Sequence, residues 1–144
     1  MKNQTRHLVA LLGLVILLSA VSASGQAPSS LLVKVPFSFT VEHQQLPAGE
    51  YRIQAIAPKS LSVRSTDGKY LATVLTMPVK GKAPETNGAI VFHRYGNKYF
   101  LAQVWEPAQT IGTETYKTHE EVEVAKLQKD VQVAVLVPYA APSR

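Results

Sequence analysis

The sequence predicts a mainly β protein: an antiparallel β-sandwich or a small β-barrel of about seven strands, with one short helix near the C-terminus. Three observations lead to this prediction. Apolar residues alternate with polar ones over several short runs, turn residues such as Asp-Gly and Gly-Asn separate the runs, and one late segment begins with a helix-capping pattern. The chain has no cysteine. Apolar burial and backbone pairing must therefore hold the fold without disulfides.

The N-terminal residues have the layout of a secretory signal peptide over residues 1–23. Lys2 and Arg6 precede an uncharged apolar run at 8–18, and small residues follow up to an expected cut after Ala23. The run is shorter than the roughly 18–20 residues that a membrane-spanning helix needs. We therefore expect export to the periplasm or out of the cell, with no stable membrane span after cleavage. An uncleaved N-terminal anchor is the alternative.

The remaining chain divides into a flexible lead-in at 24–30, a single β-rich domain at 31–137 and a C-terminal tail at 138–144. Cleavage after Ala23 would leave 121 of the 144 residues, which is enough to bury one core. The formal net charge of +5 would fall to about +3 once the two bases of the leader are removed. A charge this weak and scattered argues against nucleic acid as a partner.

The first half of the domain predicts four strands. Alternation over 33–41 indicates the first, and Pro36 within it predicts a sheet edge or a bulge because proline cannot donate to a ladder. The turn Leu46-Pro-Ala-Gly leads into a second strand at 51–57. A short third strand begins at Leu61, and the hairpin signal Asp67-Gly68 separates it from a fourth at 70–77. Residues 78–88, with two prolines and two glycines, predict a long loop.

The stretch V-F-H-R-Y-G-N-K-Y-F-L-A-Q-V-W at 91–105 predicts a β-hairpin with the two-residue turn Gly96-Asn97. Counting back from the turn, His93 faces Phe100, and Arg94 faces Tyr99 and can lie across its ring. A regular register gathers four side chains on one face as a candidate platform for a sugar or a peptide: Arg94, Tyr99, Gln103 and Trp105. The interpretation that we favour for His93 is a histidine satisfied by its neighbours at the rim of a core.

The C-terminal part predicts a polar loop, a helix and a strand. The loop covers 107–118, and Thr118 can cap a helix whose acids come early and bases late. The run E-V-E-V also alternates like a strand, so 119–129 stays open between helix and strand. We expect its glutamates to form a solvated face. The β-branched run 131–137 predicts the last strand, which Pro138 ends.

The sequence carries no recognisable catalytic or metal-binding pattern. The four histidines have no paired ligand spacing, H-E-E-V-E at 119–123 lacks the second histidine of a zinc helix, and neither a nucleophile elbow nor a glycine-rich phosphate loop is present. We expect no catalytic residue, no metal and no cofactor. A paired-carboxylate hydrolase assembled across strands is a distant alternative.

Four segments together resemble a family of small exported bacterial β-proteins: V-P-F-S-F-T-V (35–41), L-P-A-G-E-Y (46–51), V-R-S-T-D-G-K (63–69) and the hairpin at 91–105. The resemblance covers about residues 31 to 129. The family carries no assigned activity, so the resemblance implies an exported β-domain and transfers no site. The strong strand at 131–137 departs from the family pattern.

The function that we expect is non-enzymatic: an exported β-domain that binds a partner or supports an envelope assembly. The partner would be an envelope protein, a glycan or a small apolar ligand, and the sequence does not fix the oligomeric state. The main alternative is a carrier with an apolar barrel interior. A carrier predicts an enclosed apolar cavity of several hundred Å³, whereas a binding domain predicts a filled interior with an outer patch near Trp105.

Overall fold

The computed structural model describes residues 29–81 and 87–136. The expected signal peptide, nearly all of the lead-in and the C-terminal tail lie outside these residues, so those predictions are not tested. The described part contains ten strands and one helix, and the predicted mainly β class is confirmed. The elements are β1 (Ser30–Val35), β2 (Phe39–Val41), β3 (Gln44–Leu46), β4 (Gly49–Ala57), β5 (Ser60–Ser65), β6 (Leu71–Lys80), β7 (Ala89–Tyr95), β8 (Lys98–Trp105), β9 (Ile111–Thr115), α2 (His119–Leu127) and β10 (Val131–Leu136).

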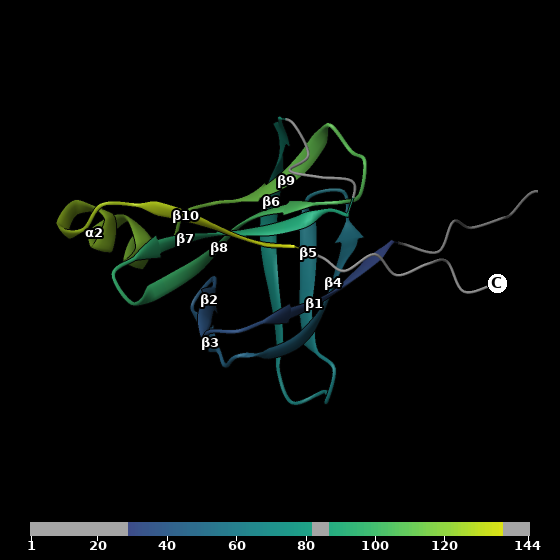
Figure 1. Ribbon diagram of the computed structural model, residues 1–144, viewed down its shortest axis with the longest axis horizontal. Helices are drawn as coiled ribbons and strands as arrows, with labels where there is room; N and C mark the ends of the chain where they lie inside the picture. Colours follow the sequence, from purple (N-terminus) through teal and green to yellow (C-terminus); the bar gives the residue numbers. More distant parts are fainter. Residues whose placement is uncertain (1–28, 82–86, 137–144) are drawn as a thin grey trace, which may run out of the picture.

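The strands form one open sheet that bends strongly on itself. Strands β1, β4, β5 and β6 pair in that order, and the second half of β6 then pairs with β9, which pairs with β8. Strand β8 also pairs with β7, and β7 with β10. In Figure 1 the strands β7, β8 and β10 cross β4 and β5 at a steep angle. The long strand β6 contributes to both halves because each half of it pairs with a different neighbour.

The first predicted strand is two strands, and the break lies at Pro36. Strand β1 ends at Val35 and pairs with β4, whereas β2 begins at Phe39 and pairs with β3 and β8. Proline has no N–H to continue the ladder. Strand β1 lies at an edge of the sheet, as the sequence predicts. The chain also bends at Pro36 and changes partners, a break that the sequence does not predict.

Three further parts of the fold differ from the predicted elements. Strand β3 was missed, and β9 occupies five of the twelve residues predicted as the loop 107–118. Strand β6 continues to Lys80, through Pro78, into the predicted loop 78–88. Helix α2 begins after Thr118, whose side chain accepts from the Glu121 N–H at 3.2 Å, so the helix and its cap are confirmed and the strand alternative is excluded. The last strand is confirmed over 131–136.

The core lies between the two halves of the bent sheet and is filled by aromatic and branched side chains. Phe39 lies at its centre: its ring makes edge-to-face contacts with Tyr51 and Phe92, with centroids 5.1 and 5.2 Å apart. The largest fully buried side chains of this core come from six strands, and they are Val33, Val35, Phe39, Val41, Leu46, Tyr51, Val63, Ile90 and Phe92. Alternation places these residues inward, as predicted for β1, β4 and β5.

The hairpin of β7 and β8 has the predicted turn and register next to the turn. Tyr95 pairs with Lys98, Arg94 with Tyr99 and His93 with Phe100. Gly96 has φ +62°, the positive value that the first residue of a two-residue hairpin loop of type II′ requires. Beyond Phe92 and Leu101 the register shifts by one residue, which marks a β-bulge.

The bulge directs Trp105 into the protein rather than outward. Trp105 is only 5% exposed, and a Cβ atom at Gly81 or Gly112 would lie 2.7 Å from its indole ring. Both glycines are therefore needed for the close approach of the backbone to the ring. The prediction of an outer apolar patch near Trp105 is therefore wrong.

Within the described ranges, no helix is both long and apolar enough to cross a membrane.

Candidate functional site: a polar cleft beside the hairpin turn

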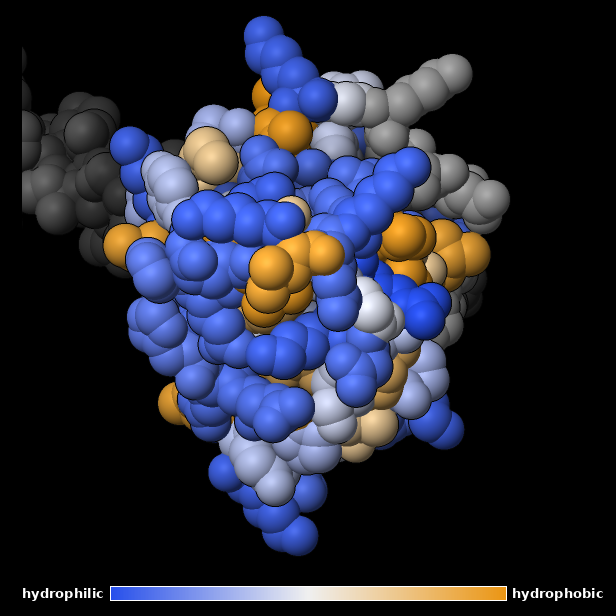
Figure 2. Space-filling model, turned by 90° about the vertical axis from the view of Figure 1, so that its left-hand side faces the viewer, coloured by the Kyte–Doolittle hydropathy of each residue, from blue (hydrophilic) through white to orange (hydrophobic). Residues whose placement is uncertain are grey.

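A cleft of about 390 Å³ opens between the β2–β3 hairpin, the turn of the β7–β8 hairpin and the start of α2. We call it the polar cleft. Its walls carry hydroxyl, amide, imidazole and charged side chains, and its residues are Ser38, Phe39, Thr40, His43, Gln45, Asn97, Lys98, Tyr99 and Glu120. Figure 2 shows the side of the molecule on which α2 lies, and this side is mostly hydrophilic with small separate hydrophobic patches.

The local structure of the β2–β3 hairpin produces the cleft. Val41 pairs with Gln44, so Glu42 and His43 form a two-residue turn, and Glu42 has a positive φ of 55°. Strand β2 meets β8 through a single parallel pair, Thr40 with Phe100. Because this pairing is so short, the hairpin diverges from the first residues of β8. The space that it leaves exposes the side chains around Asn97 and Lys98.

The charged side chains of the polar cleft neutralise each other. Lys98 Nζ lies 3.3 Å from the Glu120 carboxylate, and both side chains are about half exposed. His43 and Tyr99 supply the rings. Tyr99 is held in place by Phe37, which stacks on it with centroids 3.9 Å apart and planes 15° from parallel. The cleft therefore offers several uncharged hydrogen-bonding groups, an ordered aromatic ring and no net formal charge from this pair.

A second hollow of about 210 Å³ adjoins the polar cleft at Asn97 and Lys98. It lies between the hairpin turn and α2, and its other lining residues are Tyr95, Val124, Leu127 and Gln128. Leu127 is largely exposed. A ligand that extends past Lys98 would meet an apolar surface there.

A buried polar cluster lies on the other side of the turn, under α2. Glu121 is the only residue of the helix that is buried, and its Oε1 accepts hydrogen bonds from His93 Nδ1 at 2.7 Å and from Tyr95 Oη at 3.2 Å. His93 and Tyr95 are two residues apart on β7, so they lie on one face of the strand, opposite the core residue Phe92. The cluster joins the helix to the sheet. We call it the helix anchor.

The surroundings of the helix anchor perturb Tyr95. Burial of its hydroxyl raises the pKa of Tyr95 well above its usual value of 10.0, and the negative charges of Glu121 and Asp130 raise the pKa further. The phenol therefore stays neutral, and its hydroxyl donates a hydrogen bond to the Glu121 carboxylate. The Glu121 carboxylate and the His93 imidazole are hydrogen-bonded to each other. All buried polar side-chain atoms of the described residues have hydrogen-bond partners.

The structure does not bring the four predicted platform residues together. Arg94 and Tyr99 form one pair, with the guanidinium 5.7 Å from the ring centroid, as predicted. Gln103 and Trp105 form another, with Trp105 Nε1 donating to Gln103 Oε1 at 3.1 Å. The β-bulge lies between the two pairs: Val104 now shares the core face with Leu101, so Gln103 and Trp105 lie on the opposite face from Tyr99. Only Tyr99 lines the polar cleft.

Sequence reasoning missed most of the polar cleft and the role of Glu121. The prediction that the α2 glutamates form a solvated face is wrong at Glu121, which is 3% exposed. Its position as third residue after the Thr118 cap gave no sign of burial. The run E-H-Q-Q at 42–45 did carry a signal: four polar residues between Val41 and Leu46 interrupt the strand and are typical of a turn.

Comparison of the chain with protein-family models, curated proteins and solved structures found no match. The fold and the cleft by themselves define the class of protein, which is a small mainly β domain with a polar surface cleft. The resemblance seen in the sequence assigns no role to any residue of that cleft.

Proposed function

We propose that the protein is an exported, non-enzymatic binding domain that holds a neutral oligosaccharide in the polar cleft. One observation carries the proposal: among the described residues, the lining of a cleft of about 390 Å³ includes one lysine and one carboxylate, Lys98 and Glu120, and these are paired with each other. Such a cleft gives no electrostatic advantage to a strongly charged ligand. It is instead rich in groups that both donate and accept hydrogen bonds.

The remaining side chains of the cleft match the surface of a sugar. Hydroxyls of Ser38 and Thr40 and amides of Gln45 and Asn97 can each donate to and accept from ring hydroxyls. Tyr99 adds an aromatic ring whose orientation is fixed by Phe37, so little conformational entropy is lost when a ligand packs on its free edge. This combination favours a glycan over the other partners expected from the sequence.

The carrier alternative has less support. A carrier of apolar ligands needs an enclosed apolar cavity, whereas the core is filled by Phe39, Tyr51 and Phe92 in mutual contact and the cleft is polar and open. The non-enzymatic part of the proposal rests on the helix anchor, where Glu121 and His93 are engaged with each other beneath α2. An envelope protein stays a candidate partner.

Binding is tested by isothermal titration with neutral hexasaccharides, namely cellohexaose, maltohexaose and the fully N-acetylated form of chitohexaose. Gln45→Ala removes one amide from the polar cleft, and Gln132→Ala is the matched control, because Gln132 is an exposed residue of β10 outside the cleft. A lost hydrogen bond of about 0.5–1.5 kcal/mol corresponds to roughly 2- to 12-fold weaker binding. We expect this loss for Gln45→Ala and no change for the control.

Two results would contradict the proposal. The first is the absence of heat and of chemical-shift change at Asn97 and Tyr99 for all three sugars at millimolar concentration. The second is equal weakening by the two glutamine substitutions, which would place binding outside the polar cleft.

Export is tested separately. The leader at 1–23 motivates cleavage after Ala23, so protein recovered from the producing cells should begin at Ser24 when sequenced from its N-terminus. Recovery of Met1 in a membrane fraction would contradict cleavage and favour the anchor alternative.

A further inference from the structure

A row of four exposed side chains crosses the outer face of the sheet, on strands that do not line the polar cleft. Leu32 on β1 pairs with Arg52 on β4, Arg52 with Arg64 on β5, and Arg64 with Leu71 on β6. Because side chains alternate along a strand, these four point outward while their neighbours are buried in the core. We call this surface, together with Lys34 and Leu75, the arginine face.

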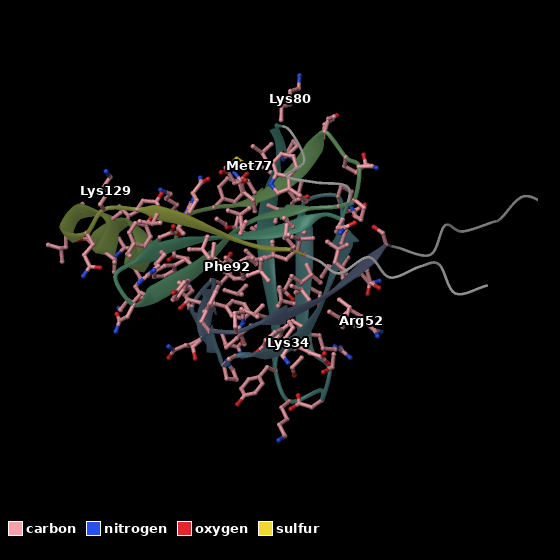
Figure 3. All side chains as sticks on the ribbon, viewed as in Figure 1. Lys34, Arg52, Met77, Lys80, Phe92 and Lys129 are labelled. Atoms are coloured by element: carbon pink, nitrogen blue, oxygen red, sulfur yellow. The ribbon has the colours of Figure 1, made fainter. Side chains whose placement is uncertain are left out.

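The two arginines at the centre of the arginine face lie directly opposite each other. Like charges in this arrangement destabilise a pair of strands. No ion pair joins either guanidinium to a carboxylate among the described residues. In the adjacent row Lys34 faces Glu50, so these two opposite charges balance each other. The net positive charge of the face is therefore that of the two arginines. In Figure 3 the Arg52 side chain projects away from the core that contains Phe92. An anionic partner would relieve the repulsion between the arginines.

Large aliphatic side chains flank this charge. Leu32 is 46% exposed, Leu71 48% and Leu75 62%, and the two leucines of the arginine row lie at its two ends. A soluble polyanion would contact the guanidinium groups and leave the leucines in water. A bilayer of anionic phospholipid provides phosphates for the arginines and an acyl boundary for the leucines at the same time.

We infer that the arginine face is a docking surface for an anionic phospholipid membrane, with Arg52 and Arg64 at the level of the lipid phosphates and Leu32, Leu71 and Leu75 toward the acyl chains. This contact is peripheral. The arginine face and the polar cleft share no residue, so the membrane contact does not occupy the cleft itself. The protein would then present the cleft from the membrane surface.

The test is cosedimentation of the protein, as isolated from the producing cells, with sucrose-loaded vesicles. One set contains phosphatidylcholine with 30 mol% phosphatidylglycerol and the other phosphatidylcholine alone. Each basic residue near an anionic surface contributes about 1 kcal/mol, so Arg52→Gln with Arg64→Gln should weaken binding to the anionic vesicles by roughly 30-fold. The matched control, Lys126→Gln with Lys129→Gln, removes the same charge from the last turn of α2 and the residues that follow it, and it should change binding by less than threefold.

The design separates the arginine face from other causes of binding. The leader, if it is retained, carries Lys2 and Arg6 and can itself bind anionic vesicles. It is present in every variant, so its contribution cancels when the arginine variant is compared with its control. Substituting the opposed arginines should leave the melting temperature unchanged or raise it, so that a binding loss is not a loss of fold. Leu75→Gln should also weaken binding by at least threefold. Equal binding of the arginine variant and the control would overturn the inference. So would binding to heparin with none to anionic vesicles, which would assign the face to a soluble polyanion.

Discussion

Removing the carboxylate of the helix anchor should destabilise the fold far more than removing its neighbour in the sequence. The Glu121 side chain is 4% exposed and accepts two hydrogen bonds, from His93 at 2.7 Å and Tyr95 at 3.2 Å. Glu121→Ala leaves both partners in the core without an acceptor, and each unsatisfied buried group costs about 1–3 kcal/mol. We expect a loss of about 3–5 kcal/mol, as for other buried pairs broken on one side.

Glu120→Ala is the matched control for this prediction. It makes the same change one residue earlier in α2, but Glu120 is about half exposed and its ion pair with Lys98 is a surface contact. Exposed pairs contribute about 0–1 kcal/mol. Urea unfolding followed by circular dichroism in one buffer gives both free energies of unfolding. If the two variants differ by less than about 1 kcal/mol, the helix anchor does not hold α2 to the sheet and the reasoning is refuted.

Glu121→Gln refines the same measurement. The amide keeps one oxygen that can accept from Tyr95 or His93 and nearly the same volume, so we expect a loss between those of the two alanine variants. A loss as large as that of Glu121→Ala would mean that charge, rather than the acceptor geometry, dominates the contribution of this side chain.

Three further predictions concern the core, the turn and the response to alkali. Phe39→Ala should cost about 3–5 kcal/mol in urea melts, because its ring contacts two other core aromatics; a loss under about 1 kcal/mol would contradict its central place. Gly96→Val should lower the melting temperature more than His93→Gln, because Gly96 has a positive φ and the Gln128 side chain occupies the space of a new Cβ. A glutamine at position 93 can still donate a hydrogen bond to Glu121. The reverse order of the two melting temperatures would point to a site at His93. The pKa of Tyr95 is raised on folding, so the stabilisation that comes from its neutral hydroxyl is complete below the unfolded pKa of about 10 and is lost as pH rises through the folded pKa. Tyr95→Phe should therefore reduce the fall of the melting temperature between pH 9 and 11. A fall as steep as that of the unsubstituted protein would contradict this prediction.

The local pattern of the sequence was enough to predict the elements that are held by nearby residues. The two-residue turn at Gly96-Asn97 determined the pairing of Arg94 with Tyr99, and Thr118 with the acids after it identified the start of α2. In both cases the interactions span only a few residues, so they can be recognised in a linear chain.

Long-range choices could not be predicted in the same way. The extra residue at the β-bulge moved Gln103 and Trp105 to the other face, and alternation alone cannot show where such a residue lies. Burial of Glu121 depends on His93, which is 28 residues away and provides its partner. The polar cleft depends on how β2 meets β8, a contact between segments that carry no mutual signal in a single sequence.

The parallel contact between β2 and β8 also has a consequence for the order of folding. Thr40 and Phe100 are about 60 residues apart, so joining them before other structure forms costs about 3–4 kcal/mol of loop-closure entropy. The β4–β5–β6 meander and the β7–β8 hairpin close much shorter loops. We therefore expect the β2–β3 hairpin to dock late, after the transition state for folding. Substitutions in that hairpin would then accelerate unfolding and leave the refolding rate nearly unchanged, so the wall of the cleft would be the first part of the core to open.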